Sequence, residues 1–221
     1  MKALLKYADN RDPDSLANVL RRRRFRLFES LCAAAPRPLR ILDVGGVEHF
    51  WRFMGYADRA DVEIVLLNVK PLQPRAANIS AVVGDAREMA GLADREFPIA
   101  FSNSVIEHVG GLEQQARMAS EIRRVASRYF VQTPNRFFPL ETHFLVPGFQ
   151  FLPLAVRVAL VQRFALGYHE ALPDREEAIR AVTEIRLLTR AELSTLFPGA
   201  EIRHERVAGL TKSFLAVGGW S

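Results

Sequence analysis

The chain has 221 residues, of which 49% are hydrophobic and 25% are charged, values that suit one folded domain and exclude an intrinsically disordered chain. The net charge of +5 could suit nucleic acid, but the sequence lacks base-stacking motifs and zinc-ligand spacings. Neither a nucleic-acid partner nor a bound metal is therefore predicted. The single cysteine excludes a disulfide framework, and the start of the chain has no apolar stretch typical of a signal peptide. These features predict a cytoplasmic protein.

Residues 1–38 are predicted to form an N-terminal helical cap. Its helix carries arginines at 21–24, and Arg24 lies inside the apolar stripe, four residues from both Leu20 and Phe28. An arginine on a buried face usually pairs with an anion. Arg24 is therefore predicted, in preference to Arg23, to bind a carboxylate of either a cofactor or the protein itself.

Residues 39–135 alternate short apolar runs with helical patterns, which is typical of a parallel sheet covered by helices. The predicted strands are 40–44, 63–68, 80–84, 99–103 and 129–133. Residues 183–221 predict a helix capped at Thr189, followed by two strands that turn at Gly209 and Leu210. The expected fold is α/β, with a doubly wound, mostly parallel seven-stranded sheet and an antiparallel C-terminal hairpin.

Residues 136–182 are too aromatic and apolar for a solvated loop and predict a hydrophobic lid inserted into this single domain. Pro147, Pro153 and Arg157 interrupt the apolar run, so it lacks the roughly 20 apolar residues of a membrane-spanning helix. Peripheral membrane contact stays open as an alternative. The sequence does not determine an oligomeric state.

The first predicted strand ends at Asp43 and turns on Gly45 and Gly46 into a helix near Glu48. Open α/β sheets bind ligands at this carboxyl edge, where glycines allow close approach and a helix offers free N–H groups. A nucleotide-like cofactor fits this place. A tight turn that binds nothing is the structural alternative.

Later strands also end in polar or small residues. Asn68 ends the second strand and can reach ribose hydroxyls. Asp85 and Ala86 follow the third strand, where the carboxylate can accept a hydrogen bond from an exocyclic amine. Ser102 and Asn103 end the fourth strand and are expected on the floor of the crevice. These residues predict one cofactor site along the sheet edge.

The motifs LDVGG, GDA and FSNSVIEHV, in this order, resemble the cofactor motifs of class I S-adenosylmethionine-dependent methyltransferases. The resemblance implies that S-adenosylmethionine is the cofactor and S-adenosylhomocysteine the product. It places Asp43, Gly45 and Gly46 at the methionine end of the cofactor. It assigns the ribose to Asn68 and the adenine to Asp85.

Two departures from the family pattern accompany this resemblance. Val47 and His49 replace two glycines of the usual loop, and Asn68 replaces the usual acidic residue, which weakens its hydrogen bond to ribose. A dehydrogenase would use the same sheet edge but would need a G-x-G-x-x-G loop and an acidic second-strand end. Both are missing from this sequence.

The segment 129–153 resembles a bacterial methyltransferase subgroup with some members in glycan and lipid biosynthesis. The predicted function is methyl transfer to a small-molecule, glycan or lipid-like acceptor, at oxygen. An RNA or protein methyltransferase is one alternative, and a noncatalytic or redox nucleotide-binding fold is another. A compact hydrophobic lid favours a small acceptor over a macromolecule.

A hydroxyl acceptor benefits from a general base because its pKa is high. His143, in the lid, is the predicted base or acceptor-positioning residue, and His108, after the fourth strand, is its rival. Either one could instead be a structural histidine.

Overall fold

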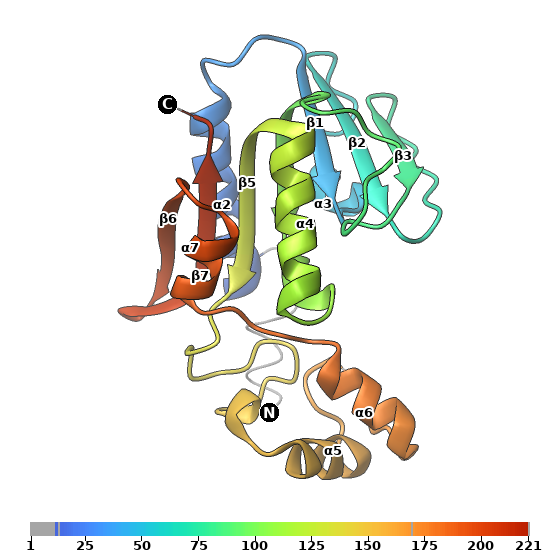
Figure 1. Cartoon of the computed structure of the whole chain (residues 1–221), viewed down its shortest axis with the longest axis vertical. Helices are drawn as coiled ribbons and strands as arrows, with labels where there is room; N and C mark the ends of the chain where they lie inside the picture. Colours follow the sequence, from blue (N-terminus) through green and yellow to red (C-terminus); the bar gives the residue numbers. More distant parts are fainter. Residues whose placement is uncertain (1–11, 13, 169, 221) are drawn as a thin grey trace.

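The computed structural model describes residue 12 and residues 14–168 and 170–220, so residues 1–11 of the expected N-terminal cap lie outside the described residues. Its centre is a seven-stranded sheet in the order β3-β2-β1-β4-β5-β7-β6 (Figure 1). The strands are β1 Leu39–Val44, β2 Val62–Asn68, β3 Ile79–Val83, β4 Phe97–Asn103, β5 Ala126–Pro134, β6 Glu201–Val207 and β7 Leu210–Gly218.

Strands β1 to β5 are parallel, and β7 lies antiparallel between β5 and β6. The fold expected from the sequence is confirmed. The hairpin turns at Ala208 (φ 48°) and Gly209 (φ 81°), one residue earlier than predicted. Two successive positive φ angles match the tight turns that follow the twist of an antiparallel pair.

Helices cover both faces of the sheet and bury a core on each (Figure 1). Leu39 and Ile41 of β1 join the core under α2 (Leu16–Cys32) and α3 (Glu48–Phe53). Leu42 and Val44 join the core under α4 (Leu112–Val125) and α7 (Arg190–Leu196). This alternation is the two-residue period of a strand buried on both sides, which explains its continuous apolar sequence.

The predicted cap of α7 is present. The Thr189 hydroxyl accepts from the backbone N–H of Glu192 at 3.2 Å, and the Glu192 carboxylate accepts from the N–H of Thr189 at 2.8 Å. Such a reciprocal pair satisfies two N–H groups at the helix start and fixes where the helix begins.

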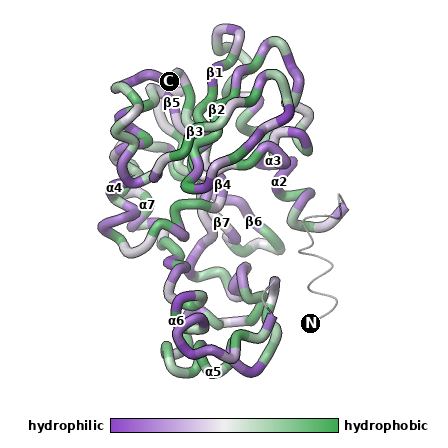
Figure 2. Tube along the Cα trace, turned by 90° about the vertical axis from the view of Figure 1, so that its right-hand side faces the viewer, coloured by the Kyte–Doolittle hydropathy of each residue, from purple (hydrophilic) through white to green (hydrophobic). Residues whose placement is uncertain are grey.

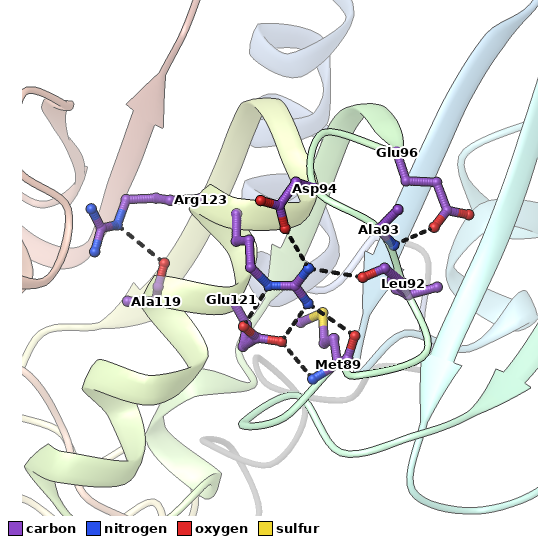
Figure 3. Close-up of polar contacts among 9 residues, drawn as sticks. Met89, Leu92, Ala93, Asp94, Glu96, Ala119, Glu121 and Arg123 are labelled. Atoms are coloured by element: carbon purple, nitrogen blue, oxygen red, sulfur yellow. Dashed lines mark hydrogen bonds and ion pairs between the residues drawn. The ribbon is translucent and has the colours of Figure 1, made fainter.

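A polar cluster fastens the segment between β3 and β4 to the end of α4 (Figure 3). Arg124 donates to the carbonyl oxygens of Met89 and Leu92 at 2.9 and 2.8 Å and to the Glu121 carboxylate. Glu121 in turn accepts from the N–H of Met89 at 2.6 Å. The crossover helix thereby anchors the segment that begins with Asp85.

The predicted lid lies beyond the carboxyl ends of the parallel strands, as Figures 1 and 2 show. It contains α5 (Leu154–Arg163) and most of α6 (Arg175–Thr183). Its apolar residues form a cluster of their own: Phe144, Phe149, Val158, Val161, Leu166, Ala178 and Val182. The lid is therefore a small packed unit. Among the described residues, no helix has the length and apolarity that crossing a membrane requires.

Candidate functional site

Three adjacent cavities, which share some of their lining residues, lie along the carboxyl edge of the sheet. The loop cavity, about 240 Å³, adjoins the turn after β1, and the strand-end cavity, about 350 Å³, adjoins the ends of β2 and β3. The lid chamber, about 620 Å³, lies between the sheet edge and the lid. Gly45 lines the first two cavities, and His108 and Ser104 line both the strand-end cavity and the lid chamber. Arg21 and Asn103 line both the loop cavity and the lid chamber.

Asp43 and the two glycines after it lie together at the loop cavity. Asp43 is 2% exposed, and burial raises the pKa of its carboxyl to about 7, although the Trp51 indole N–H donates to it at 2.7 Å. Gly45 has a φ of +81°, and a Cβ on Gly46 would lie 1.6 Å from Asp43 Oδ2. The backbone conformation therefore favours glycine at 45, and the close approach of the Asp43 carboxylate favours glycine at 46.

The strand-end cavity brings together Asn68, Asp85 and Ala86, as the sequence predicted. The Asn68 amide donates to the carbonyl of Gly46 at 3.2 Å and ties the β2 end to the glycine turn. Asp85 accepts from Arg87 Nε at 2.9 Å, and this guanidinium holds the pKa of Asp85 below its usual value. Asp85 therefore presents an ionised acceptor at this cavity.

Two predicted cofactor residues have structural partners instead. Ser102 is fully buried, and its hydroxyl donates to the Val44 carbonyl at 3.1 Å, so it joins β4 to β1 beneath the crevice floor. Arg24 is buried as predicted, but its carboxylate is the protein's own: Nε donates to Glu205 Oε1 at 3.1 Å. Its guanidinium also donates to Asn103. The assignment of Arg24 to the cofactor is corrected to an ion pair between α2 and β6.

Arg21 is the arginine of α2 that the sequence argument missed. Its side chain lines both the loop cavity and the lid chamber. Burial, followed by the charge of Arg24, lowers its pKa. Helical periodicity alone does not identify Arg21, because residues of the β1 turn and of the lid complete the walls of these cavities.

The two predicted histidines meet in the lid chamber. The rings of His108 and His143 lie edge to face, with centroids 4.9 Å apart. Glu141 Oε1 lies 2.6 Å from His143 Nδ1. Burial lowers the pKa of His143, but the Glu141 hydrogen bond and charge outweigh burial and raise the pKa overall. Burial, then the charge of His143, lowers the pKa of His108 to about 4.

Glu107 lies beside these histidines and was not predicted as a site residue. Its side chain is fully buried, and burial raises its pKa to about 7. Oε2 accepts from the Thr133 hydroxyl at 3.1 Å, whereas Oε1 has no hydrogen-bond partner within the described part of the chain. One ligand atom each from Glu107, His108 and His143 lie within 4.8 Å of one another.

Comparisons with known proteins reveal a shared fold and a short sequence match. No protein-family model matches the chain. Two uncharacterised proteins from Mycobacterium tuberculosis, of strains CDC 1551 / Oshkosh and H37Rv, are 34% identical to it over 67 residues. The match covers 30% of this chain and 23% of each relative, so the chain corresponds to less than a quarter of their length.

Solved structures match over far more of the chain. The N-terminal domain of EvdMO1, crystallised in the presence of S-adenosylhomocysteine and D-fucose, is 20% identical with a TM-score of 0.54. The match covers 90% of this chain and 82% of that domain. The CurJ carbon methyltransferase is 11% identical with a TM-score of 0.60, over 97% of this chain and 56% of that one. The chain therefore has a fold found in methyltransferases.

Proposed function

We propose that the chain is an S-adenosylmethionine-dependent methyltransferase that releases S-adenosylhomocysteine. The observation that carries the proposal is that Asp43 lines one cavity, and Asn68 and Asp85 line an adjacent one, on the carboxyl edge of the sheet. These are the residues that the motif resemblance assigns to the three parts of this cofactor. The EvdMO1 domain, which has this fold and was crystallised with S-adenosylhomocysteine, supports the proposal.

The charges at the loop cavity fit the amino-acid end of the cofactor. Asp43 offers a carboxylate for the ammonium group, and Arg21 lines the same cavity and offers a guanidinium for the carboxylate. The strand-end cavity offers Asn68 to ribose and Asp85 to the exocyclic amine of adenine. Ala86 lines that cavity beside Asp85.

The lid chamber fits a small amphipathic acceptor with a hydroxyl group. Leu20, Phe138 and Leu140 give it apolar walls, while His108 and His143 place polar groups in it. A volume near 620 Å³ suits a small molecule or the reactive part of a glycan or lipid. An RNA or protein acceptor is less favoured, because the lid covers the chamber.

The chemistry needs alignment more than activation, because the sulfonium already carries a reactive methyl group. The acceptor hydroxyl loses its proton in the lid chamber, where His143, held by Glu141, and His108 lie. Bound S-adenosylmethionine would supply the methyl group to that oxygen and would leave as a neutral thioether. The lid excludes water from this transfer.

Calorimetry on the full chain tests the proposed function. S-adenosylhomocysteine is expected to bind, and NAD and NADP are expected to give no heat, because the chain lacks the dinucleotide loop. Asp85→Ala should weaken S-adenosylhomocysteine binding by about 1–3 kcal/mol through the lost hydrogen bond to adenine. Asp94→Ala, at an exposed ion pair with Arg124, is the matched control and should bind as the wild type does. Binding of NAD alone would overturn the proposal.

Cofactor affinity should also depend on pH through Asp43. Because its pKa is raised to about 7, the carboxyl holds a proton below that pH, and a cationic ligand must displace it. Affinity should therefore rise with pH and level off above about 7, with proton release on binding near pH 6. Calorimetry in two buffers of different ionisation enthalpy measures this release.

Asp43→Asn provides the test of this assignment, because an amide cannot titrate. The variant should release no proton from this position, whereas Asp94→Asn, at an exposed carboxylate, should behave as the wild type. Equal proton release by wild type and Asp43→Asn would place the titrating group elsewhere.

A further inference from the structure

We propose that Glu107, His108 and His143 bind a divalent transition-metal cation at the wall of the lid chamber. The binding itself stands on the geometry of these three residues, and only its catalytic role rests on the proposed methyl transfer. The sequence predicted no metal site, because the ligands come from separate segments that form no recognised spacing.

The three side chains are already close to the arrangement that a cation needs. Their ligand atoms lie within 4.8 Å of one another, and the two imidazole rings meet edge to face. Metal–ligand bonds of about 2.0–2.2 Å place neighbouring ligand atoms about 3.4 Å apart in a tetrahedral site. Small rotations of the side chains are enough to close the site.

Glu107 supplies the second, independent observation. Its side chain is fully buried, yet Oε1 lacks a hydrogen-bond partner among the described residues. A buried carboxylate oxygen without a partner is costly, because water no longer solvates it. Thr133 holds only Oε2, at 3.1 Å. A cation shared with the two imidazoles would give Oε1 the partner that it lacks.

Glu141 contacts the His143 ring through its carboxylate, as carboxylates commonly do with histidines that bind a metal. It is 3% exposed, and its Oε2 accepts the backbone N–H groups of His143 and Phe144 at 2.8 and 2.7 Å. Its Oε1 lies 2.6 Å from His143 Nδ1. With Nδ1 occupied, Nε2 is the nitrogen left for a metal.

The donor set selects the kind of cation. Two imidazoles with one carboxylate suit zinc, manganese, cobalt or nickel, whereas magnesium and calcium prefer oxygen ligands. Three protein ligands leave a coordination position for the acceptor hydroxyl. A cation held by these three residues would lower the pKa of a hydroxyl bound at that position and so favour its deprotonation.

The test is calorimetric titration of the untagged full chain, stripped with a chelator, with Zn²⁺ alone and then with Co²⁺ alone. We expect one site per chain, and cobalt should develop the visible absorption of nitrogen and oxygen ligation. Glu107→Gln and His143→Ala should each weaken binding by at least about 10–100-fold, the size of effect seen for altered metal sites. His204→Ala removes a histidine that lies outside the cluster and should bind as the wild type does.

Glu107→Gln retains an oxygen for Thr133, and circular dichroism should show that the variant is folded. The metal site would be overturned if the wild type bound neither Zn²⁺ nor Co²⁺. It would also be overturned if Glu107→Gln and His143→Ala both bound the metal as tightly as the wild type. S-adenosylhomocysteine binding, measured separately on the stripped protein, reports on the proposed function alone. Cofactor binding without metal binding therefore rejects only the metal, and metal binding without cofactor binding rejects only the methyltransferase.

Discussion

His143→Ala should lower turnover by about 10²–10⁴-fold while leaving S-adenosylhomocysteine affinity nearly unchanged. The ring lies in the lid chamber, with Nδ1 2.6 Å from Glu141 Oε1, whereas the residues proposed to bind the cofactor line the neighbouring cavities. The substitution removes the His143 imidazole, which is proposed to deprotonate the acceptor directly or to bind the metal that does so. A metabolite extract incubated with the wild type and labelled S-adenosylmethionine first identifies the acceptor. Turnover is then measured as the rate of transfer of labelled methyl to that acceptor.

His204→Ala is the matched control, since this histidine lies on β6 and contacts Thr211. Its turnover should equal that of the wild type. If His143→Ala changes turnover by only a few-fold, then methylation at nitrogen or carbon, or a base at His108, becomes the better interpretation.

Arg24→Met should destabilise the fold by about 3–5 kcal/mol, because it leaves the Glu205 carboxylate buried without its cation. Glu205 is 8% exposed and accepts from Arg24 Nε at 3.1 Å and from the Ser213 hydroxyl at 2.7 Å. Urea unfolding measures the change. Arg26→Met, at an exposed position on the same helix, should stay within about 0.5 kcal/mol of the wild type.

The double variant Arg24→Met/Glu205→Leu separates loss of the ion pair from loss of packing. Removing both charges should recover most of the stability, because no buried charge is left without a partner. If the Arg24→Met protein were stable but bound S-adenosylhomocysteine much more weakly, Arg24 would instead be assigned to cofactor binding.

Local sequence patterns predicted the strands and the start of α7, because these depend on interactions between residues close together in the chain. The strands follow from apolar runs that end in polar residues, and the start of α7 follows from Thr189 and Glu192 three residues apart. The hairpin turn was misplaced by one residue. Its position depends on the pairing of β6 with β7, which registers Val207 against Leu210 and leaves Ala208 and Gly209 in the turn.

The site was predicted where strand ends determine it and missed where distant segments meet. Helical periodicity predicted the burial of Arg24, but it could not identify Glu205, which lies on β6 at the far end of the chain. Ser102 was expected to face the crevice because it lies near the end of a strand, yet its hydroxyl donates to the Val44 carbonyl of the neighbouring β1. Glu141 was missed because its bonds to His143 depend on the folded backbone of the lid.

His143 and Glu141 belong to the lid, whereas Glu107 and His108 follow β4 on the sheet, so the reacting groups are divided between two separately packed units. Any outward displacement of the lid carries His143 away from His108, together with the carboxylate that orients it. In the proposed methyltransferase, a cofactor that binds while the lid is displaced would meet no complete set of groups able to pass its methyl to water.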